Sequence, residues 1–354
     1  AVLVGSDSDL ITPRRRRRLA AHGIALDVVP GTHMFPMEHP EETRQALVSM
    51  IDRLLAGGQV MNAASALTLA EGRLAALVWG EAGAPTWLAL HGWLDNAASF
   101  SRLAPLLVER LGIRIVAIDF AGHGRSQPLP AGVDYAIWDY LHDVLDALDG
   151  LELEQVTLLA HSMGAGVSTL LAAALPERVS QLILIDGLGP LPTPAEEMPA
   201  QLRKGLLGHR RRLSRLPRYA DIESAVAARS TGGVMPLGAD TVRPLVLRNT
   251  EPLVGGGVQL CTDGRLMRPS LVRFTPAQVM ATLTAIQAPV LLIEAGAGVL
   301  VDREGVEQAR NAVAQLTRRV LPGDHHLHLD PATVGAVAST IVDWALQHRQ
   351  NGEY

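Results

Sequence analysis

Short apolar segments alternate with longer amphipathic ones from Leu67 to the C-terminal end of the chain. Several of the short segments are almost continuously apolar, which is typical of strands covered on both faces of a sheet. Eight strands are predicted, over Leu67–Ala70, Leu74–Trp79, Trp87–Leu90, Ile113–Ile118, Val156–Leu159, Leu182–Ile185, Val290–Ile293 and Arg319–Leu321.

Helical segments lie between these strands. Helices are predicted over Asp134–Leu148, Ser168–Leu175 and Thr333–Leu346. In the first of them, apolar side chains recur every three or four positions and fall on one helical face. Strands that alternate with helices in this way predict an α/β fold, with a mostly parallel sheet and helices on both faces.

The alternation stops between about Leu191 and Ala285. This segment has several prolines, a basic helical stretch around His209–Arg215 and a glycine run at Gly255–Gly257. It follows one core strand and precedes another, so we expect a helical cap insertion over the carboxyl edge of the sheet, where ligands bind in open α/β sheets. The predicted core therefore comprises residues 67–190 and 286–350, and the predicted cap comprises residues 191–285.

Residues 1–57 repeat the order of elements at the C-terminal end of the chain. The sequence Val2-Leu3-Val4 parallels Val290-Leu291-Leu292, and Pro30-Gly31-Thr32-His33 parallels Pro322-Gly323-Asp324-His325. This internal repeat predicts a partial domain of strand, helix, strand and helix, followed by a linker over residues 58–66. Two origins stay open: a tandem-domain remnant, or a fusion of two reading frames near Met61.

Composition narrows the class of protein. The 354 residues are 48% hydrophobic and 19% charged with a net charge of −5, which favours a folded core and gives no indication of a nucleic-acid partner. The single cysteine, Cys261, excludes an intrachain disulfide and a cysteine-built metal site. We find neither a membrane span nor a signal peptide, so a cytoplasmic location is expected. Nothing in the sequence indicates an oligomeric state.

The strongest chemical signal is Ala160-His161-Ser162-Met163-Gly164, which follows a strand and opens a helix. A nucleophilic serine on such a sharp turn has its hydroxyl free, and the residues two before and two after must be small. Ala160 and Gly164 meet that requirement, although glycine is usual at the first position. The simpler interpretation of Ser162 is a helix N-cap.

A second signal is Leu90-His91-Gly92-Trp93-Leu94-Asp95-Asn96, directly after a buried strand. A loop in this place supplies one main-chain N–H to an oxyanion hole, and the residue after the nucleophile supplies another. The expected donors are the amides of Trp93 and Met163, while His91 is expected to shape the loop.

A histidine tract, Asp324-His325-His326-Leu327-His328, follows the last predicted strand. A base that accepts the serine proton is expected late in the chain. We choose His325, because its counterpart in the repeat is His33, with His326 as the alternative. A zinc site is the competing interpretation. No suitably spaced ligand group completes one, so no metal is predicted.

The acid that orients the histidine is the hardest residue to assign. In the loop after Val290–Ile293, Gly298 stands opposite Asp9 of the repeat, so the acid is missing from its usual place. Asp186, directly after another strand, is our choice. Asp302 and Glu294 stay open as alternatives.

Taken together, these motifs resemble the α/β-hydrolase superfamily over about residues 61–350. The stretch from His91 to Asn96 and the histidine tract resemble its serine hydrolase-like branch. Residues 1–57 resemble the C-terminal end of a second α/β-hydrolase, with Asp9 and His33 where an acid and a base would lie. The resemblance implies a serine nucleophile, an acyl-enzyme intermediate and no cofactor.

The predicted function is that of a serine hydrolase that cleaves a carboxylic ester or related acyl bond in a small-molecule substrate. Two alternatives stay open: a catalytically impaired hydrolase-fold binding protein, and a carbon–carbon bond hydrolase on the same fold. The positive charge of the run Arg210–Arg212 in the predicted cap would attract an acidic substrate.

Overall fold

The computed structural model describes residues 2–5, 26–30, 32, 34–41, 43, 64–211, 216–232 and 236–350. The chain divides into two compact units, residues 1–63 and 64–354. In the first unit, β1 (Val2–Gly5) pairs in parallel with β2 (Leu26–Val29), and α2 (Phe35–Glu38) follows. Asp9, His33, most of the predicted helix over residues 42–55 and most of the predicted linker lie outside the described residues.

An eight-stranded sheet forms the centre of the second unit. Its strands are β3 (Ser65–Leu69), β4 (Leu74–Trp79), β5 (Thr86–Leu90), β6 (Arg114–Ile118), β7 (Val156–His161), β8 (Val179–Ile185), β12 (Val290–Ala297) and β13 (Leu316–Asp324). The spatial order is β13-β12-β8-β7-β5-β6-β4-β3. Only β3 with β4 and β4 with β6 pair antiparallel. The predicted mostly parallel sheet is therefore confirmed.

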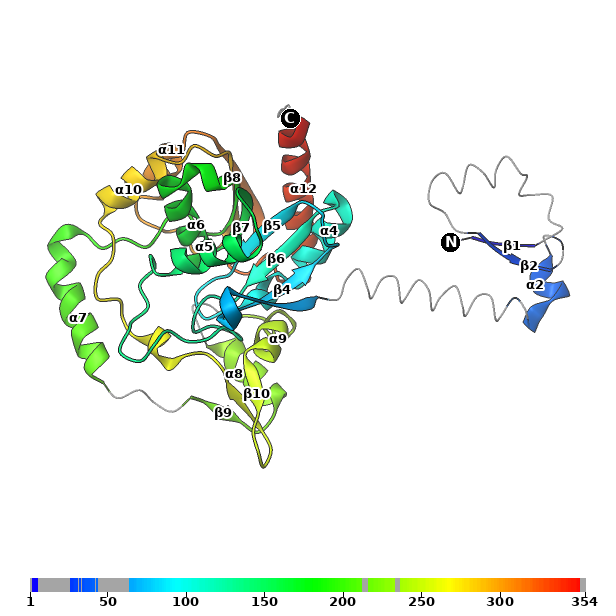
Figure 1. The fold of residues 1–354 in the computed structure, drawn as a ribbon, viewed down its shortest axis with the longest axis horizontal. Coiled ribbons are helices and arrows are strands. Elements are labelled where there is room, and N and C mark those ends of the chain that lie inside the picture. Colours follow the sequence, from blue (N-terminus) through cyan, green and yellow to red (C-terminus); the bar gives the residue numbers. More distant parts are fainter. Residues whose placement is uncertain are drawn as a thin grey trace. The chain divides into compact units, whose positions relative to one another are not determined.

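Helices cover both faces of this sheet (Figure 1). One face carries α4 (Leu103–Leu111) and α12 (Val334–Gln350), and the other carries α5 (Tyr140–Gly150), α6 (Met163–Ala174), α10 (Pro276–Thr284) and α11 (Val306–Ala312). Neighbouring strand residues such as Leu158 and Leu159 enter opposite core layers, and both are fully buried. Because both faces of the central strands meet a helix layer, β5, β7 and most of β12 are largely apolar without alternation.

Two predicted helix boundaries are wrong. The helix expected from Asp134 begins only at Tyr140, because the Asp139 carboxylate accepts the Ala136 N–H and holds a turn there. The helix expected from Ser168 begins at Met163, and most of its first three turns are buried. A helix that is buried on nearly all of its faces has no polar face. The sequence therefore shows no alternation of polar and apolar residues with the helical period.

The insertion (residues 191–285) contains strands as well as helices. Its elements before α10 are α7 (Met198–Arg210), β9 (Arg218–Tyr219), α8 (Ile222–Thr231), α9 (Ala239–Arg248), β10 (Thr250–Pro252) and β11 (Val258–Leu260). The three strands form an antiparallel sheet in the order β10-β11-β9, which the expectation of a helical cap missed. Strands of two or three residues are too short to show an alternating pattern. The glycine run Gly255–Gly257 turns between β10 and β11 with positive φ at all three residues.

The last helix of the insertion packs on the core. Val279 and Leu283 of α10 belong to the same buried cluster as Leu188, which follows β8. Among the helices that the structure describes, none combines the length and apolar character needed to cross a bilayer.

Gly164 tests how tightly α6 approaches the sheet. A Cβ at this position would lie 2.2 Å from the main-chain oxygen of Leu90 in β5. We expect Gly164→Ala to lower the free energy of unfolding by about 2–3 kcal/mol, because the backbone must move to make room. Urea denaturation measures the loss.

The matched control is Gly335→Ala in the first turn of α12, where an added Cβ meets no atom within 4 Å. This variant should be neutral or more stable by roughly 0.5–1 kcal/mol. Equal losses in the two variants would contradict the packing argument.

Candidate active site

Ser162 lies at the tip of a strained turn between β7 and α6. Its backbone has φ 51° and ψ −112°, a conformation that costs a side-chain-bearing residue about 1–3 kcal/mol. Its N–H donates to the Ile185 carbonyl at 3.1 Å, which ties the turn to the end of β8. The turn keeps the partly exposed Ser162 side chain above the edge of the sheet.

A continuous chain of hydrogen bonds joins Ser162, His325 and Asp186. The Ser162 Oγ lies 2.9 Å from His325 Nε2, and His325 Nδ1 lies 2.6 Å from Asp186 Oδ2. These residues follow the carboxyl ends of β7, β13 and β8, which meet at one edge of the parallel sheet. The three residues chosen from the sequence are therefore in direct contact.

Asp186 reaches the histidine from β8 by filling a space beside the loop after β12. Its carboxylate accepts the N–H groups of Ala295 at 3.2 Å and Val299 at 2.9 Å. A Cβ on Gly298 would lie 2.2 Å from Asp186 Oδ2, so a side chain at 298 and this position of the carboxylate exclude one another. The glycine at 298 is what gives the Asp186 carboxylate its room.

The alternative acids and the alternative base lie elsewhere. Both oxygens of Glu294 are held by Arg310 at 2.7 Å, and Arg318 adds a contact at 2.9 Å. Asp302 is exposed in a turn. His326 turns its Nε2 to Asp95 Oδ2 at 2.9 Å.

The loop after β5 lies directly against the serine. A Cβ on Gly92 would be 3.2 Å from Ser162 Cβ. The main-chain N–H groups of Trp93 and Met163 have no hydrogen-bond acceptor among the described residues. His91 holds this loop: its Nε2 accepts the Phe120 N–H at 3.0 Å and its Nδ1 donates to the Gly92 carbonyl at 2.7 Å. Burial lowers the pKa of His91 to about 4, so the ring is neutral at pH 7.

Sequence reasoning missed a second polar group beside the serine. Asp95, His161 and His326 are buried. One nitrogen or oxygen atom of each side chain lies within 4.8 Å of the corresponding atoms of the other two. They belong to three segments that are far apart in the chain, so no spacing rule could find them. The signal in the sequence is that each of the three lies inside a motif already selected.

Another serine–histidine contact is fully buried. Ser99 Oγ and His328 Nε2 are 2.8 Å apart, and both residues have no exposed surface. Neither residue lines the cavity described next. Their contact joins the loop before α12 to the 3₁₀ turn Ala97–Phe100.

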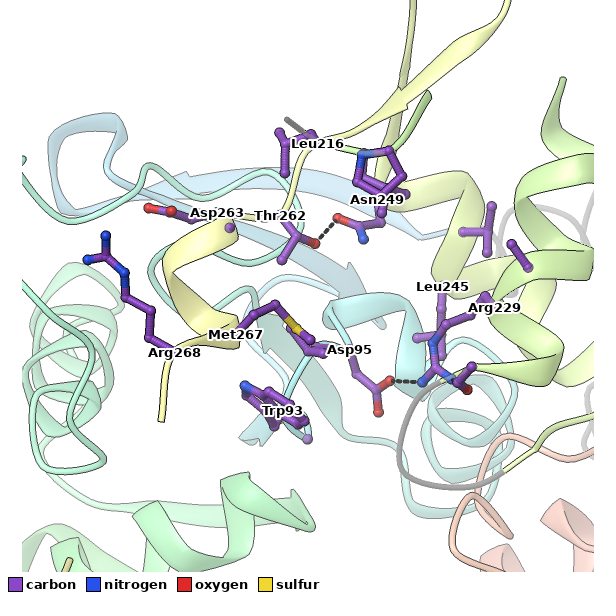
Figure 2. A pocket seen from close by; sticks show the side chains of 18 of the residues that line it. Trp93, Asp95, Leu216, Arg229, Leu245, Asn249, Thr262, Asp263, Met267 and Arg268 are labelled. Atoms are coloured by element: carbon purple, nitrogen blue, oxygen red, sulfur yellow. Dashed lines mark hydrogen bonds and ion pairs between the residues drawn. The ribbon is translucent and has the colours of Figure 1, made fainter. Parts of the chain in front are cut away.

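A cavity of about 920 Å³ opens above Ser162 and His325. The insertion supplies much of its wall, including Leu245, Leu260 and Met267. Figure 2 shows Arg229 of α8 reaching Asp95 from the insertion side, with Trp93 and Met267 facing the same space. The insertion therefore covers the carboxyl edge of the sheet.

Cationic side chains from the insertion also line the cavity, namely Lys204, Arg211 and Arg268. Arg211 belongs to the basic run singled out in the sequence, whereas Arg212 lies outside the described residues. An acidic group on the substrate stays a prediction.

Comparison with known proteins agrees with this architecture. Residues 85–222 match the family model of the alpha/beta hydrolase fold. A serine hydrolase-like protein of Dictyostelium discoideum is 30% identical over 288 residues, covering 78% of this chain and 79% of that protein. One of Danio rerio is 30% identical, covering 77% of this chain and 85% of that protein.

Solved structures show the same likeness. A hypothetical protein from Pseudomonas aeruginosa PAO1 is 41% identical with a TM-score of 0.73, covering 80% of this chain and 99% of that chain. The thioesterase domain from the curacin biosynthetic pathway is 27% identical with a TM-score of 0.68, covering 79% and 99%.

The fold and the arrangement of its strand ends define an α/β hydrolase. Within that superfamily the chain belongs to the serine hydrolase-like proteins, as the similarity over most of its length shows.

Buried neutral histidines make stability depend on pH. Burial lowers the pKa of His91 to about 4 and that of His123 to about 3. The unfolded chain titrates near 6.5 and so binds more protons than the folded chain between these values. The stabilisation is complete above pH 6.5 and is lost as the pH falls toward 4.

We expect the free energy of unfolding to drop by about 3 kcal/mol between pH 6.5 and pH 5 from these two histidines. Urea denaturation at several pH values measures the slope. His123→Gln should reduce the slope by up to ~1.4 kcal/mol per pH unit. A free energy of unfolding that does not change with pH would refute the prediction.

Proposed function

We propose that this protein is a serine hydrolase that cleaves a carboxylic ester or related acyl bond through an acyl-enzyme intermediate. The observation that carries the proposal is the hydrogen-bonded chain from Asp186 through His325 to Ser162, which opens into the 920 Å³ cavity. A nucleophile, a base and an orienting acid in contact are the requirements of this chemistry.

In the first half-reaction, Ser162 Oγ attacks the acyl carbon while His325 Nε2 accepts its proton. The 2.9 Å separation of the two atoms is within the range for direct proton transfer. Asp186 accepts a hydrogen bond from His325 Nδ1, which fixes the tautomer with a free Nε2 lone pair and stabilises the imidazolium. His325 then returns the proton to the leaving group.

The main-chain N–H groups of Trp93 and Met163 are assigned the role of stabilising the negative charge that forms on the acyl oxygen. Two features support this role. The Gly92 backbone lies against Ser162, and Met163 is the first residue of α6, where N–H groups have no partner within the helix. Fixed dipoles in this position stabilise the tetrahedral intermediate without reorganisation.

In the second half-reaction, a water molecule takes the place of the leaving group. His325 Nε2 accepts a proton from this water as the water attacks the acyl carbon, and then returns the proton to Ser162 Oγ as the bond to the acid breaks. None of these steps needs a cofactor.

The substrate is a small acyl compound whose apolar part fits the Leu245, Leu260 and Met267 wall. Thioesters are within the proposed class, and the 27% identical thioesterase domain supports their inclusion. The alternative of an impaired binding protein is based on the missing acid at position 298, whereas the 2.6 Å contact of Asp186 with His325 supports the hydrolase. Carbon–carbon bond hydrolysis has no specific observation in its favour. A cytoplasmic location stays a prediction.

A fluorophosphonate probe tests the nucleophile. We expect covalent labelling of the purified protein at Ser162, identified by peptide mass spectrometry, and no labelling of Ser162→Ala. The matched control is Ser99→Ala, because Ser99 also bonds to a histidine but is buried away from the cavity. Folded wild-type protein that resists the probe would count against the proposal.

Transfer of the carboxylate from position 186 to position 298 tests the role of Asp186. Asp186→Gly should lower kcat by about 10³–10⁴ because the histidine loses its orienting partner. Glycine suits the φ of 43° at this position, so the backbone should be retained. In the double variant Asp186→Gly with Gly298→Asp, a carboxylate returns to the same space, and we expect kcat to recover at least tenfold.

The matched control is Asp302→Asn, which changes an exposed carboxylate in the same loop region and should leave kcat unchanged. If Asp302→Asn were as damaging as Asp186→Gly, the acid would be misassigned. Steady-state kinetics on a chromogenic ester, with circular dichroism as the check on folding, measure these effects.

A further inference from the structure

Three buried side chains converge on one point at the floor of the cavity, next to Ser162. Asp95 comes from the loop after β5, His161 is the last residue of β7, and His326 follows β13. Asp95 Oδ2 lies 2.9 Å from His326 Nε2 and 3.7 Å from His161 Nδ1. All three residues are among those that line the cavity.

The hydrogen bond that His161 makes through Nε2 determines whether Nδ1 carries a proton. Nε2 lies 2.9 Å from the His325 carbonyl oxygen, which can only accept, so Nε2 carries the proton. With its single proton on Nε2, the imidazole presents Nδ1 as a bare lone pair. Within the described part of the chain, this buried atom has no hydrogen-bond partner.

The lone pair faces a carboxylate. Burial alone would raise the pKa of Asp95, but the attraction and hydrogen bond of His326 and the charge of Arg229 hold that pKa below its usual range. Two electron-rich atoms, His161 Nδ1 and Asp95 Oδ2, therefore point at one another across 3.7 Å. A bound cation between them would satisfy both.

The donor set has the chemistry and the dimensions of a transition-metal site. Two imidazole nitrogens and one carboxylate oxygen suit Zn²⁺ and its neighbours. Tetrahedral zinc with bonds of about 2.0–2.1 Å sets its ligand atoms roughly 3.4 Å apart, between the two separations seen here. The bond from His161 Nε2 to a carbonyl is also the usual outer support of a metal-binding histidine.

Gly92 packs closely against two of these ligand atoms. A Cβ at position 92 would lie 3.0 Å from His161 Nδ1 and 3.2 Å from Asp95 Oδ2. With three protein ligands, the remaining position of a tetrahedral ion would be left for water or another small ligand.

We propose that Asp95, His161 and His326 form a binding site for a divalent transition metal ion such as Zn²⁺, and that its occupation inhibits the hydrolase. Binding forms metal bonds to Asp95 Oδ2, His161 Nδ1 and His326 Nε2. The proton on His326 Nε2 moves to its Nδ1 or leaves to solvent. The ion then lies beside Gly92 and Ser162, where it blocks the approach of the acyl group to the serine.

The binding test needs no substrate, so it is independent of the proposed hydrolysis. The full chain is freed of metal and titrated with Co²⁺, which gives a visible absorption spectrum, and with Zn²⁺ in competition with a chromogenic chelator. We expect wild-type protein to show a site that His161→Gln weakens at least 30-fold. The matched control is His209→Gln, which changes a histidine paired with Asp134 that does not line the cavity. This variant should bind like the wild type.

Metal bound elsewhere on the chain contributes equally to all three proteins and cancels in the comparison. Equal affinity of wild-type protein and His161→Gln would overturn the proposal, as would a loss of binding in His209→Gln alone. If His161→Gln does not fold, Asp95→Asn replaces it, because the amide keeps the shape of the carboxylate and loses its charge. That variant should also bind at least tenfold more weakly.

The inhibition is measured separately, with each protein compared with its own metal-free rate. Zn²⁺ should inhibit wild-type hydrolysis over the same concentration range in which it binds, and a chelator should restore the rate. Binding without inhibition would overturn the inhibitory role. Inhibition that His161→Gln does not shift would overturn the assignment of the site.

Discussion

The bond between the Asp186 carboxylate and His325 Nδ1 is the contact on which the site depends. This 2.6 Å contact connects the ends of β8 and β13, which are separated in the sheet by β12. The carboxylate spans that gap by accepting the Ala295 and Val299 N–H groups from the loop after β12. The position and the tautomer of the histidine thus both depend on one buried carboxylate held by main-chain N–H groups.

The constraint behind this geometry is close packing at the carboxyl edge. Gly92, Gly164 and Gly298 each leave no room for a Cβ without a contact of 3.2 Å or less to the residues around Ser162 or Asp186. These three glycines act in different ways: one lets the loop touch the serine, one lets α6 meet β5, and one admits the carboxylate. The backbone strain at Ser162 and Asp186, both with positive φ, persists because this packing over-determines it.

Much of the fold could be predicted because burial on both sides of the sheet leaves a local signature. Most of the eight strands contain short apolar runs, and Ser162 and His325 follow two of the strands. Asp186 was harder, because its match to His325 depends on which strands are neighbours in space. The absence of an acid at Gly298 looked like a loss, and only the coordinates relate it to the arrival of Asp186. The short strands of the insertion and the group of Asp95, His161 and His326 arise from contacts that no local pattern records.

Asp95 couples the insertion to the floor of the site. Its Oδ2 bonds to His326, and its Oδ1 contacts Arg229 of α8 at 3.3 Å. Moving α8 would take the half-buried Arg229 away from the buried carboxylate of Asp95. The loss of this partner is costly for a charge that is out of water. The Asp95 carboxylate therefore links the insertion, the loop after β5 and the residue after His325. Burial lowers the pKa values of the neighbouring His161 and His328 rings well below the usual value. In the proposed mechanism the positive charge therefore develops at His325, which bonds to Asp186 at 2.6 Å.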